Sequence, residues 1–323
     1  MKIYLAGSYA DGVYESLSAQ LLPHELIHVE SQSELDNVTD AQCIILRVLK
    51  ADGSTIRRNK DLRSIIRWGV GYDSVDIRTA GECGVLVSNM PGANAYAVAE
   101  LALGMMIMLS RRVGQYCTSM QNGHWQREDA YHFLPATLNG KTVGIIGGGN
   151  IGKRIARLVQ ALGAEAVYYD AFRLHPEQEE QLAMKYLSLD ELLFCADIVT
   201  LHVPLLEGTY HMIGAAELSK MKEGSILINV ARGGLVDDFA LLAALNTGHL
   251  SGAGIDCVED ESSATTLELS TRADVLLTPH IGGTASDLAT AMTKVAAAMI
   301  HRMEETGDTG NVVNREYLHH AVQ

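Results

Sequence analysis

The stretch Lys141–Gly152, which reads KTVGIIGGGNIG, constrains the fold of this chain more than any other part of the sequence. It opens with an apolar run, Thr142–Ile146, that is typical of a strand buried in a parallel sheet. Three glycines follow in the spacing G-x-G-x-x-G: Gly147, Gly149 and Gly152. Apolar residues then recur at helical intervals up to Leu162, and Gly163 stands where a helix would end. The pattern predicts a strand, a tight glycine turn and a helix in immediate succession.

A glycine turn with this spacing between a strand and a helix is typical of a dinucleotide-binding unit. The first glycine allows the tight turn, the second lets the backbone approach a pyrophosphate, and the third lets helix and strand pack closely. The amino end of the helix offers free N–H groups and the positive end of a dipole to the phosphates. The alternative is a glycine turn with a purely structural role.

A second strand-like run, Ala166–Tyr169, ends in Asp170, 18 residues after Gly152. An acidic residue at the tip of this strand accepts hydrogen bonds from an adenosine ribose. Its charge also repels a 2′-phosphate, so the sequence predicts NAD as the cofactor in preference to NADP. Arg173 lies nearby and can soften that preference.

Length and composition set the class of protein. With 323 residues, of which 47% are apolar, the chain has room for two globular domains. A formal charge of −14 argues against a nucleic-acid partner. No membrane span is expected, because the apolar run Ala95–Leu109 is short and contains Glu100. No signal peptide is expected either. Five cysteines without a C-x-x-C pair predict a reduced, cytoplasmic protein with no metal site.

Strand-like and helical patterns divide the chain into two parts. The first hundred residues predict a small α/β unit with strands at Lys2–Ala6, Cys43–Leu46, Leu62–Trp68 and Val85–Ser88. From Lys141 to Gly283, strands and helices alternate, which predicts a parallel, doubly wound sheet. Its later strands are expected at Ile198–Val203, Ser225–Val230, Gly252–Ile255 and Val275–Leu277. Long helices are expected at Ala95–Arg112, apolar on most faces, and at Thr284–Met303.

Each of these later strands is followed by a polar side chain: His202, Arg232, Asp256 and His280. Ligands of open α/β sheets bind beyond the carboxyl ends of the strands, so these side chains are expected on the cofactor side. Hydride transfer between a nicotinamide and a carbonyl needs a cation for the substrate, a proton donor and a group that sets the donor's charge.

Three residues suit these roles. The guanidinium of Arg232 can bind a carboxylate through two hydrogen bonds, and the imidazole of His280 can exchange a proton near neutral pH. The carboxylate of Glu261 can hold the tautomer of that imidazole and raise its pKa. The alternatives are an arginine that braces a loop, an ordinary strand-end histidine and a solvated acidic loop.

The chain resembles the D-isomer-specific 2-hydroxyacid dehydrogenase family. The resemblance lies in the segments RWGVGYDSVDI, VAELALGMM, KTVGIIGGGNIGKRIA, INVARGGLVDDFAL, GAGIDCVEDE and LLTPHIGG, in that order. It implies an α/β architecture in which a doubly wound, parallel-sheet (Rossmann) NAD domain, residues 101–284, is inserted into a smaller flavodoxin-like substrate domain, residues 1–100 and 285–323. It also implies a homodimer formed through the helix around residues 95–112.

The same resemblance assigns roles to residues. It implies that Arg232, Glu261 and His280 are catalytic, and that Val70 and Gly71 join Arg232 and His280 in binding the substrate. The implied NAD-binding residues are Gly147, Gly149, Asn150, Ile151, Gly152, Asp170, Val203, Pro204, Val230, Ala231, Asp256, His280 and Gly282. The sequence departs from the family at Ser262, where a proline is usual, at Val258, where an aromatic residue is usual, and at Trp68, which is larger than usual.

The resemblance implies an NAD-dependent enzyme that interconverts a small anionic D-2-hydroxy acid and its 2-oxo acid. The candidate substrates are 3-phosphoglycerate, glycerate or hydroxypyruvate, and acids of the D-lactate type. A phosphorylated substrate would need further cations, for which Arg47, Arg57 and Arg67 are candidates. The alternatives are a regulatory, corepressor-like protein that senses NAD(H) and an enzyme that resembles phosphite dehydrogenase.

Overall fold

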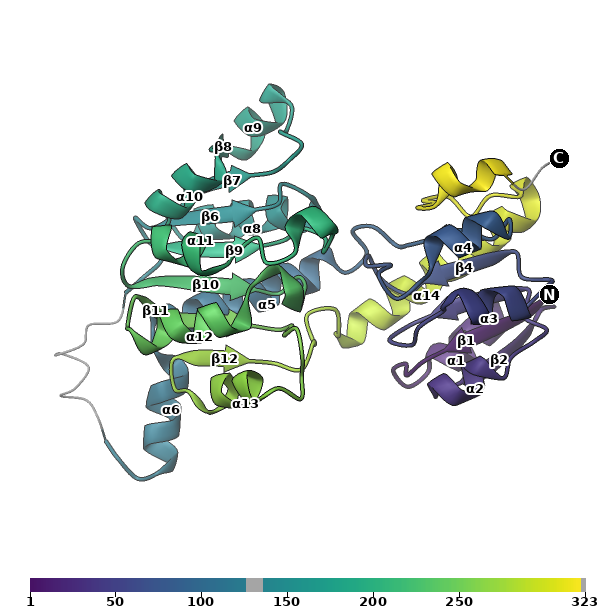
Figure 1. The fold of residues 1–323 in the computed structure, drawn as a ribbon, viewed down its shortest axis with the longest axis horizontal. Helices are drawn as coiled ribbons and strands as arrows, with labels where there is room; N and C mark the ends of the chain where they lie inside the picture. Colours follow the sequence, from purple (N-terminus) through teal and green to yellow (C-terminus); the bar gives the residue numbers. More distant parts are fainter. Residues whose placement is uncertain (126–135, 321–323) are drawn as a thin grey trace. The chain divides into compact units, whose positions relative to one another are not determined.

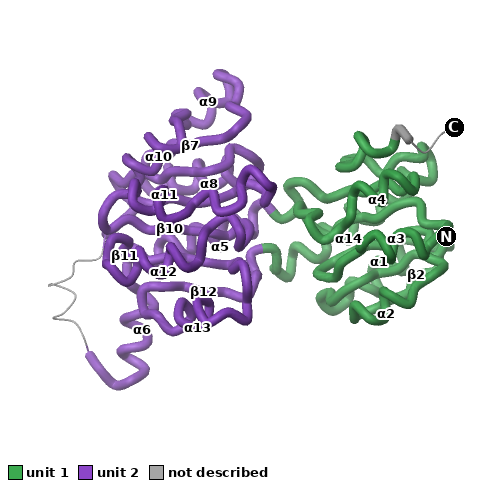
Figure 2. Tube along the Cα trace, viewed as in Figure 1, with its two compact units in different colours: residues 1–94, 283–323 green, residues 95–282 purple. Residues whose placement is uncertain are grey.

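The chain forms two compact units in a computed structural model that describes residues 1–125 and 136–320. One unit consists of Met1–Asn94 with Gly283–Gln323, and the other of Ala95–Gly282 (Figure 2). The helix that starts at Ala95 therefore belongs wholly to the second unit. We refer to them as unit 1 and unit 2.

In the described residues of unit 1, five parallel strands form a sheet in the order β2-β1-β3-β4-β5. The strands are β1 (Lys2–Ala6), β2 (Glu25–Val29), β3 (Cys43–Leu46), β4 (Ser64–Arg67) and β5 (Leu86–Ser88). This is the flavodoxin-like strand order, so the predicted fold of this unit is confirmed. The accompanying helices are α1 (Val13–Gln20), α2 (Gln32–Asp36), α3 (Gly53–Arg58), α4 (Ile77–Glu82) and α14 (Ser286–Thr306), with a 3₁₀ turn η3 (Arg315–His320).

The C-terminal segment completes unit 1 by pairing with β5. The N–H of Val313 donates to the carbonyl of Val87 over 2.8 Å. The side chain of Asn314, which is fully buried, accepts from the Val87 N–H and donates to the Val85 carbonyl, each over 2.9 Å. Since these are backbone groups at the edge of the sheet, the C-terminal segment supplies the partners that β5 would otherwise lack.

The described part of unit 2 holds a seven-stranded parallel sheet in the order β12-β11-β10-β9-β6-β7-β8 (Figure 1). The strands are β6 (Thr142–Ile146), β7 (Glu165–Tyr169), β8 (Lys185–Tyr186), β9 (Ile198–Leu201), β10 (Ser225–Asn229), β11 (Leu250–Ile255) and β12 (Val275–Leu277). The strand order reverses between β6 and β9, as in the doubly wound dinucleotide-binding fold. The predicted Rossmann sheet is therefore confirmed.

Helices cover both faces of this sheet (Figure 1). The helices α5 (Ala95–Ser110) and α8 (Asn150–Ala161) pack on one face, whereas α10 (Leu189–Cys195), α11 (Ala215–Lys220) and α12 (Asp238–Asn246) pack on the other. The remaining elements among the described residues of unit 2 are α6 (Val113–Gln121), α9 (Pro176–Leu182), α13 (Ala264–Thr271), η1 (Glu207–Thr209) and η2 (Gly233–Leu235). None of the helices that the structure describes is both long enough and apolar enough to span a membrane.

Helix α5 is only partly enclosed within the chain. Its residues Val98, Ala102, Met105 and Met106 are buried, and they pack with α8 and the sheet. Its next turn, in contrast, leaves the side chains of Ile107 and Met108 37% and 38% exposed. An apolar surface therefore remains beside the carboxyl half of the helix.

Strands β2 and β8 are absent from the sequence-based prediction. Both lie at a sheet edge, where one side of the strand faces solvent. Strand β2 (ELIHV) buries only Leu26, and β8 consists of two residues. Because neither carries the continuous apolar run of a central strand, the pattern that identifies the other strands is missing.

Candidate functional site

The carboxyl ends of five neighbouring strands in unit 2 lie at one edge of the sheet. Their last residues are register partners in turn: Ile146 with Leu201, Leu201 with Asn229, Asn229 with Ile255, and Ile255 with Leu277. The loops that follow carry the glycine turn, His202, Arg232, Asp256 and His280. The structure therefore places these predicted segments along one edge, as expected for a parallel sheet.

The glycine turn after β6 leaves no room for side chains at two positions. Gly147 has a φ of +110°, and a Cβ there would lie 2.6 Å from the carbonyl oxygen of His202. A Cβ on Gly152 would lie 2.0 Å from the carbonyl oxygen of Gly147. A Cβ on Gly149 would meet no described atom within 4 Å. The first and third glycines are thus required by the protein's own packing, whereas the second borders open space.

That open space lies at the amino end of α8, whose first residues are Asn150 and Ile151. Gly149 is the N-cap residue and has no side chain to cover the free N–H groups of the first turn. A phosphate fits this arrangement, because it accepts those N–H groups and is attracted by the helix dipole.

Asp170 joins the end of β7 to the glycine turn. Its Oδ2 accepts the N–H of Gly148 over 2.7 Å, and its Oδ1 accepts the N–H of Phe172 over 2.9 Å. Both oxygens keep a further lone pair, so the carboxylate can still accept the ribose hydroxyls of an adenosine. The turn and this aspartate together fit the phosphate and ribose of NAD.

The strand-end residues Val203, Pro204, Val230 and Ala231 line the loops after β9 and β10. Their neighbour His202 has a different setting from the one expected. Its Nε2 lies 2.9 Å from the hydroxyl of Thr200, and its Nδ1 is buried without a hydrogen-bond partner among the described residues. Burial lowers the pKa of this imidazole to about 3. His202 is therefore neutral at physiological pH and is unsuited to proton exchange.

Arg232 follows β10 and is half-buried. The side-chain amide of Asn229 donates to the carbonyl oxygen of Arg232 over 2.8 Å, and the guanidinium donates from Nη1 to the carbonyl of Ala231 over 2.7 Å. Behind it, a Cβ on Gly233 would lie 2.1 Å from the carbonyl oxygen of Val258. The loop that carries Arg232 therefore packs directly against the loop that follows β11.

His280 follows β12 in a left-handed backbone conformation, with a φ of +53°. This conformation is uncommon for a residue with a side chain, and it is held here by the N–H of His280 donating to the carbonyl of Asp256 over 2.9 Å. The Asp256 carboxylate, itself buried, accepts the Thr278 hydroxyl (2.6 Å) and the N–H groups of Ile281 and Gly282 (2.8 Å each). Asp256 thus folds the loop around His280, a role that sequence reasoning missed.

Glu261 lies on an exposed turn after β11. Asp260 shapes this turn by accepting the N–H of Ser262 over 2.9 Å and its hydroxyl over 2.7 Å. The residue that replaces the family's usual proline therefore supplies hydrogen bonds that proline cannot make. Among the described residues, the hydrogen bonds that shape this turn are made by Asp260 and Glu259, and none of them involves the Glu261 carboxylate.

The neighbouring acid Glu259 is already engaged. Its carboxylate accepts the Tyr210 hydroxyl over 2.6 Å and lies 2.8 Å from Nε2 of His211. These contacts hold the pKa of the Glu259 carboxyl below its usual range. Its backbone N–H donates to Oδ2 of Asp238 over 3.0 Å. Glu259 therefore anchors the turn that carries Glu261.

The predicted substrate residues of unit 1, Val70 and Gly71, lie in the loop after β4. The carbonyl of Val70 accepts the side-chain amide of Asn89 over 2.7 Å, which fixes this loop. Trp68 is buried and packs edge-on against Tyr9, with ring centroids 5.1 Å apart.

Of the three candidate arginines, Arg47 and Arg67 follow or end the adjacent strands β3 and β4. Their guanidinium groups donate to the carbonyls of Ser8 and Leu46, respectively. Arg57, in contrast, lies on α3 and pairs with Glu82 of the neighbouring helix at 3.7 Å.

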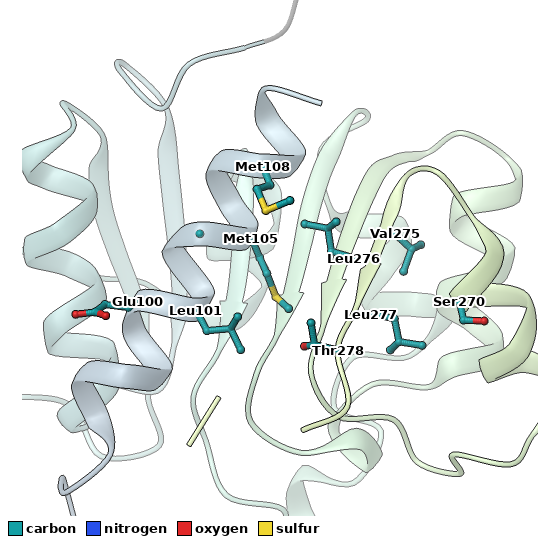
Figure 3. Close-up of a pocket in the computed structure, with 10 residues that line it drawn as sticks. Glu100, Leu101, Met105, Met108, Ser270, Val275, Leu276, Leu277 and Thr278 are labelled. Atoms are coloured by element: carbon teal, nitrogen blue, oxygen red, sulfur yellow. The ribbon is translucent and has the colours of Figure 1, made fainter. Parts of the chain in front are cut away.

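A pocket of about 390 Å³ lies elsewhere in unit 2, between α5 and β12 (Figure 3). Its walls are mainly apolar and include Leu101, Met105, Met108, Leu276 and Leu277. Among the described residues that line the pocket, Glu100 carries a charge and the others are uncharged (Figure 3). Neither Arg232 nor His280 is among the described residues that line this pocket.

Two glycine variants separate packing from ligand binding. We expect Gly152→Ala to lower the melting temperature of the protein without ligand, because its Cβ meets the Gly147 carbonyl. Gly149→Ala should leave that temperature nearly unchanged and weaken NADH binding, because its Cβ projects into open space. Thermal unfolding and NADH titration measure the two effects. Equal NADH affinity in the wild type and Gly149→Ala would contradict the placement of the phosphates.

Comparison with known proteins identifies the family. Residues 103–282 match the family model described as "D-isomer specific 2-hydroxyacid dehydrogenase, NAD binding domain". The glyoxylate reductase of Thermococcus litoralis is 35% identical over 289 residues, 88% of this chain and 87% of that protein. The hydroxypyruvate reductase of Thermotoga maritima is 35% identical over 80% of this chain and 84% of its own length.

A D-3-phosphoglycerate dehydrogenase of Archaeoglobus fulgidus is 33% identical over 97% of this chain, which spans 59% of that relative's length. Among solved structures, a glyoxylate reductase from Paecilomyes thermophila aligns with a TM-score of 0.85 and 30% identity over 98% of this chain and 99% of its own. A D-lactate dehydrogenase with NAD⁺ from Lactobacillus jensenii aligns with a TM-score of 0.80 and 29% identity, over 98% and 100% of the two chains. The chain therefore belongs to the D-isomer specific 2-hydroxyacid dehydrogenase family and is an NAD-dependent enzyme of that family.

Proposed function

We propose that the enzyme interconverts a small D-2-hydroxy acid and its 2-oxo acid. The observation that carries this proposal is the placement of Arg232 and His280 in ordered loops at the carboxyl edge of the NAD-binding sheet. Bound NAD(H) supplies or accepts the hydride. The residues of the chain bind and orient the acid and move the proton.

Arg232 is the proposed anchor for the substrate carboxylate. Its backbone is fixed by Asn229, and its planar guanidinium presents paired donors that match two carboxylate oxygens. The backbone N–H groups of Val70 and Gly71 are proposed to contribute to substrate binding, in a loop whose shape Asn89 maintains.

His280 is the proposed proton donor in reduction and proton acceptor in oxidation. Its loop is folded by Asp256, so the imidazole projects from a defined backbone. Glu261 is the proposed carboxylate that stabilises the protonated imidazole. This assignment is supported by the anchoring of its turn through Glu259 and Asp260, and by the engagement of Glu259 with Tyr210 and His211. Catalytic contacts are often long before ligands bind and tighten in the complex.

Among substrates, we favour glyoxylate and hydroxypyruvate. The relatives with these names are 35% identical to the chain and are covered over 87% and 84% of their lengths. Phosphoglycerate is a second candidate, because Arg47 and Arg67 lie at the carboxyl ends of adjacent strands in unit 1 and can attract a second anionic group. Acids of the D-lactate type form the third class.

We also propose that the enzyme is a homodimer formed through the region of residues 95–112. The exposed side chains of Ile107 and Met108 and the apolar pocket between α5 and β12 support this proposal. A second copy of the chain would remove this apolar surface from water.

A substrate panel tests the proposed activity. With NADH, we expect glyoxylate or hydroxypyruvate to give the highest kcat/KM, followed by pyruvate, branched 2-oxo acids and 3-phosphohydroxypyruvate. Initial rates of NADH oxidation measure this, and phosphite with NAD⁺ covers the phosphite dehydrogenase alternative. Tight NADH binding without turnover of any compound would contradict the proposal and favour an NAD(H)-sensing regulatory protein.

Replacing Arg232 tests the carboxylate anchor. Arg232→Lys keeps the charge but loses the paired donors, so we expect kcat/KM to fall by about 100-fold while NADH affinity stays unchanged. Arg57→Lys serves as the control, because Arg57 already pairs with Glu82 and should tolerate the change. If Arg232→Lys retains nearly full activity, another cation holds the carboxylate.

A pH profile tests the role of Glu261. Reduction requires a protonated donor, and an isolated imidazole is mostly neutral at about pH 7.5. A nearby carboxylate favours the charged form, so its removal in Glu261→Gln should move the alkaline limb of kcat/KM for reduction to lower pH. Oxidation, which needs the neutral imidazole, should then become active at lower pH than in the wild type.

Two further variants serve as controls for that pH profile. His280→Ala should depress both directions at every pH, whereas Glu268→Gln, an exposed charge change on α13, should leave the profile in place. A profile that does not move in Glu261→Gln would place the carboxylate partner elsewhere, and Glu259→Gln would be the next variant to measure.

A further inference from the structure

Arg173, three residues after Asp170, is held in an ion pair by α9. Its Nε and Nη2 donate to the two carboxylate oxygens of Glu179 over 2.8 and 2.9 Å. The guanidinium carbon also lies 5.0 Å from the ring centroid of Tyr186. The charge, two of the five N–H donors and one face of this arginine are therefore engaged within the protein.

Glu179 is the better enclosed member of the pair. Its side chain is 13% exposed, against 58% for Arg173. It also accepts the Tyr168 hydroxyl over 2.6 Å, and that hydroxyl in turn accepts the N–H of Leu174 over 2.9 Å. The bonds from Arg173 and Tyr168 lower the pKa of the Glu179 carboxyl to about 2, so it stays ionised at any physiological pH.

This ion pair borders the part of the site that receives the adenosine ribose. Asp170 accepts the N–H groups of Gly148 and Phe172, so the loop that leads to Arg173 folds back on the glycine turn. A Cβ on Gly148 would lie 3.4 Å from the side chain of Leu174, which shows how closely the end of this loop packs there. Arg173 is thus the cation best placed along this loop to meet a phosphate on the ribose 2′ oxygen.

We infer that Glu179 determines the preference for NAD over NADP by withholding Arg173 from a 2′-phosphate. If Arg173 turned to a phosphate, the Glu179 carboxylate would lose two charge-assisted hydrogen bonds and keep Tyr168 as its one hydrogen-bond donor among the described residues. Breaking a pair held by two parallel charge-assisted hydrogen bonds has a cost, so we expect the pair to persist when a dinucleotide binds. Asp170 repels the phosphate directly, and Glu179 removes the cation that would offset this repulsion. The inference rests on NAD binding and not on the identity of the substrate.

The variant Glu179→Gln tests it through binding. Glutamine can still accept the Tyr168 hydroxyl but no longer holds the guanidinium by charge. We expect the Kd for NADPH to fall roughly tenfold, because Arg173 can then form one exposed, charge-assisted contact with the phosphate. The Kd for NADH should stay within about twofold. Competition titration calorimetry measures both constants without turnover. Glu180→Gln, the same change at the next and exposed position of α9, should alter neither constant.

A double variant separates release of Arg173 from a direct effect of the Glu179 charge. When Arg173→Gln is already present, adding Glu179→Gln should leave the NADPH Kd unchanged, because no cation remains to be released. A tenfold gain that persists in the double variant would overturn the inference, since Glu179 would then act by its own charge. An unchanged NADPH Kd in Glu179→Gln, with a melting temperature like that of Glu180→Gln, would also overturn it.

Discussion

The buried carboxylate of Asp256 is the interaction on which the reactive edge of the sheet depends. An ionised group removed from water must be compensated by hydrogen bonds, and here the donors come from the loop after β12. The loop therefore has one arrangement in which the charge is satisfied. That arrangement includes the left-handed backbone of His280, whose N–H donates to the carbonyl of the same aspartate.

The adjoining loops are interlocked in the same way. The N–H of His211 donates to the carbonyl of Gly234 over 2.7 Å, while its ring contacts Glu259 and stacks on Tyr210. The loops after β9, β10 and β11 thus hold one another, and Arg232 and Glu261 extend from a single packed assembly. A site preorganised by such contacts need not spend binding energy on ordering its own loops.

The sequence allowed the prediction of features that depend on local patterns. The buried strands, the glycine turn, and the strand-end positions of Arg232 and His280 all follow from periodicity and from the rule for parallel sheets. Edge strands β2 and β8 could not be predicted, since solvent exposure removes the apolar run. Nor could the partners of Arg173 or the burial of His202, because both depend on which side chains meet in the folded chain.

The division of unit 1 into two segments has a consequence for its biosynthesis. Ribosomes deliver Met1–Asn94 first, but α14 and Asn314, which pack on α1 and satisfy the edge of β5, follow only after unit 2. At roughly 5–20 residues per second, the amino-terminal segment waits on the order of 10–40 seconds for these partners. During translation, unit 2 can fold before these partners arrive, and until then the edge of β5 lacks the groups that satisfy it, which exposes the nascent chain to aggregation there.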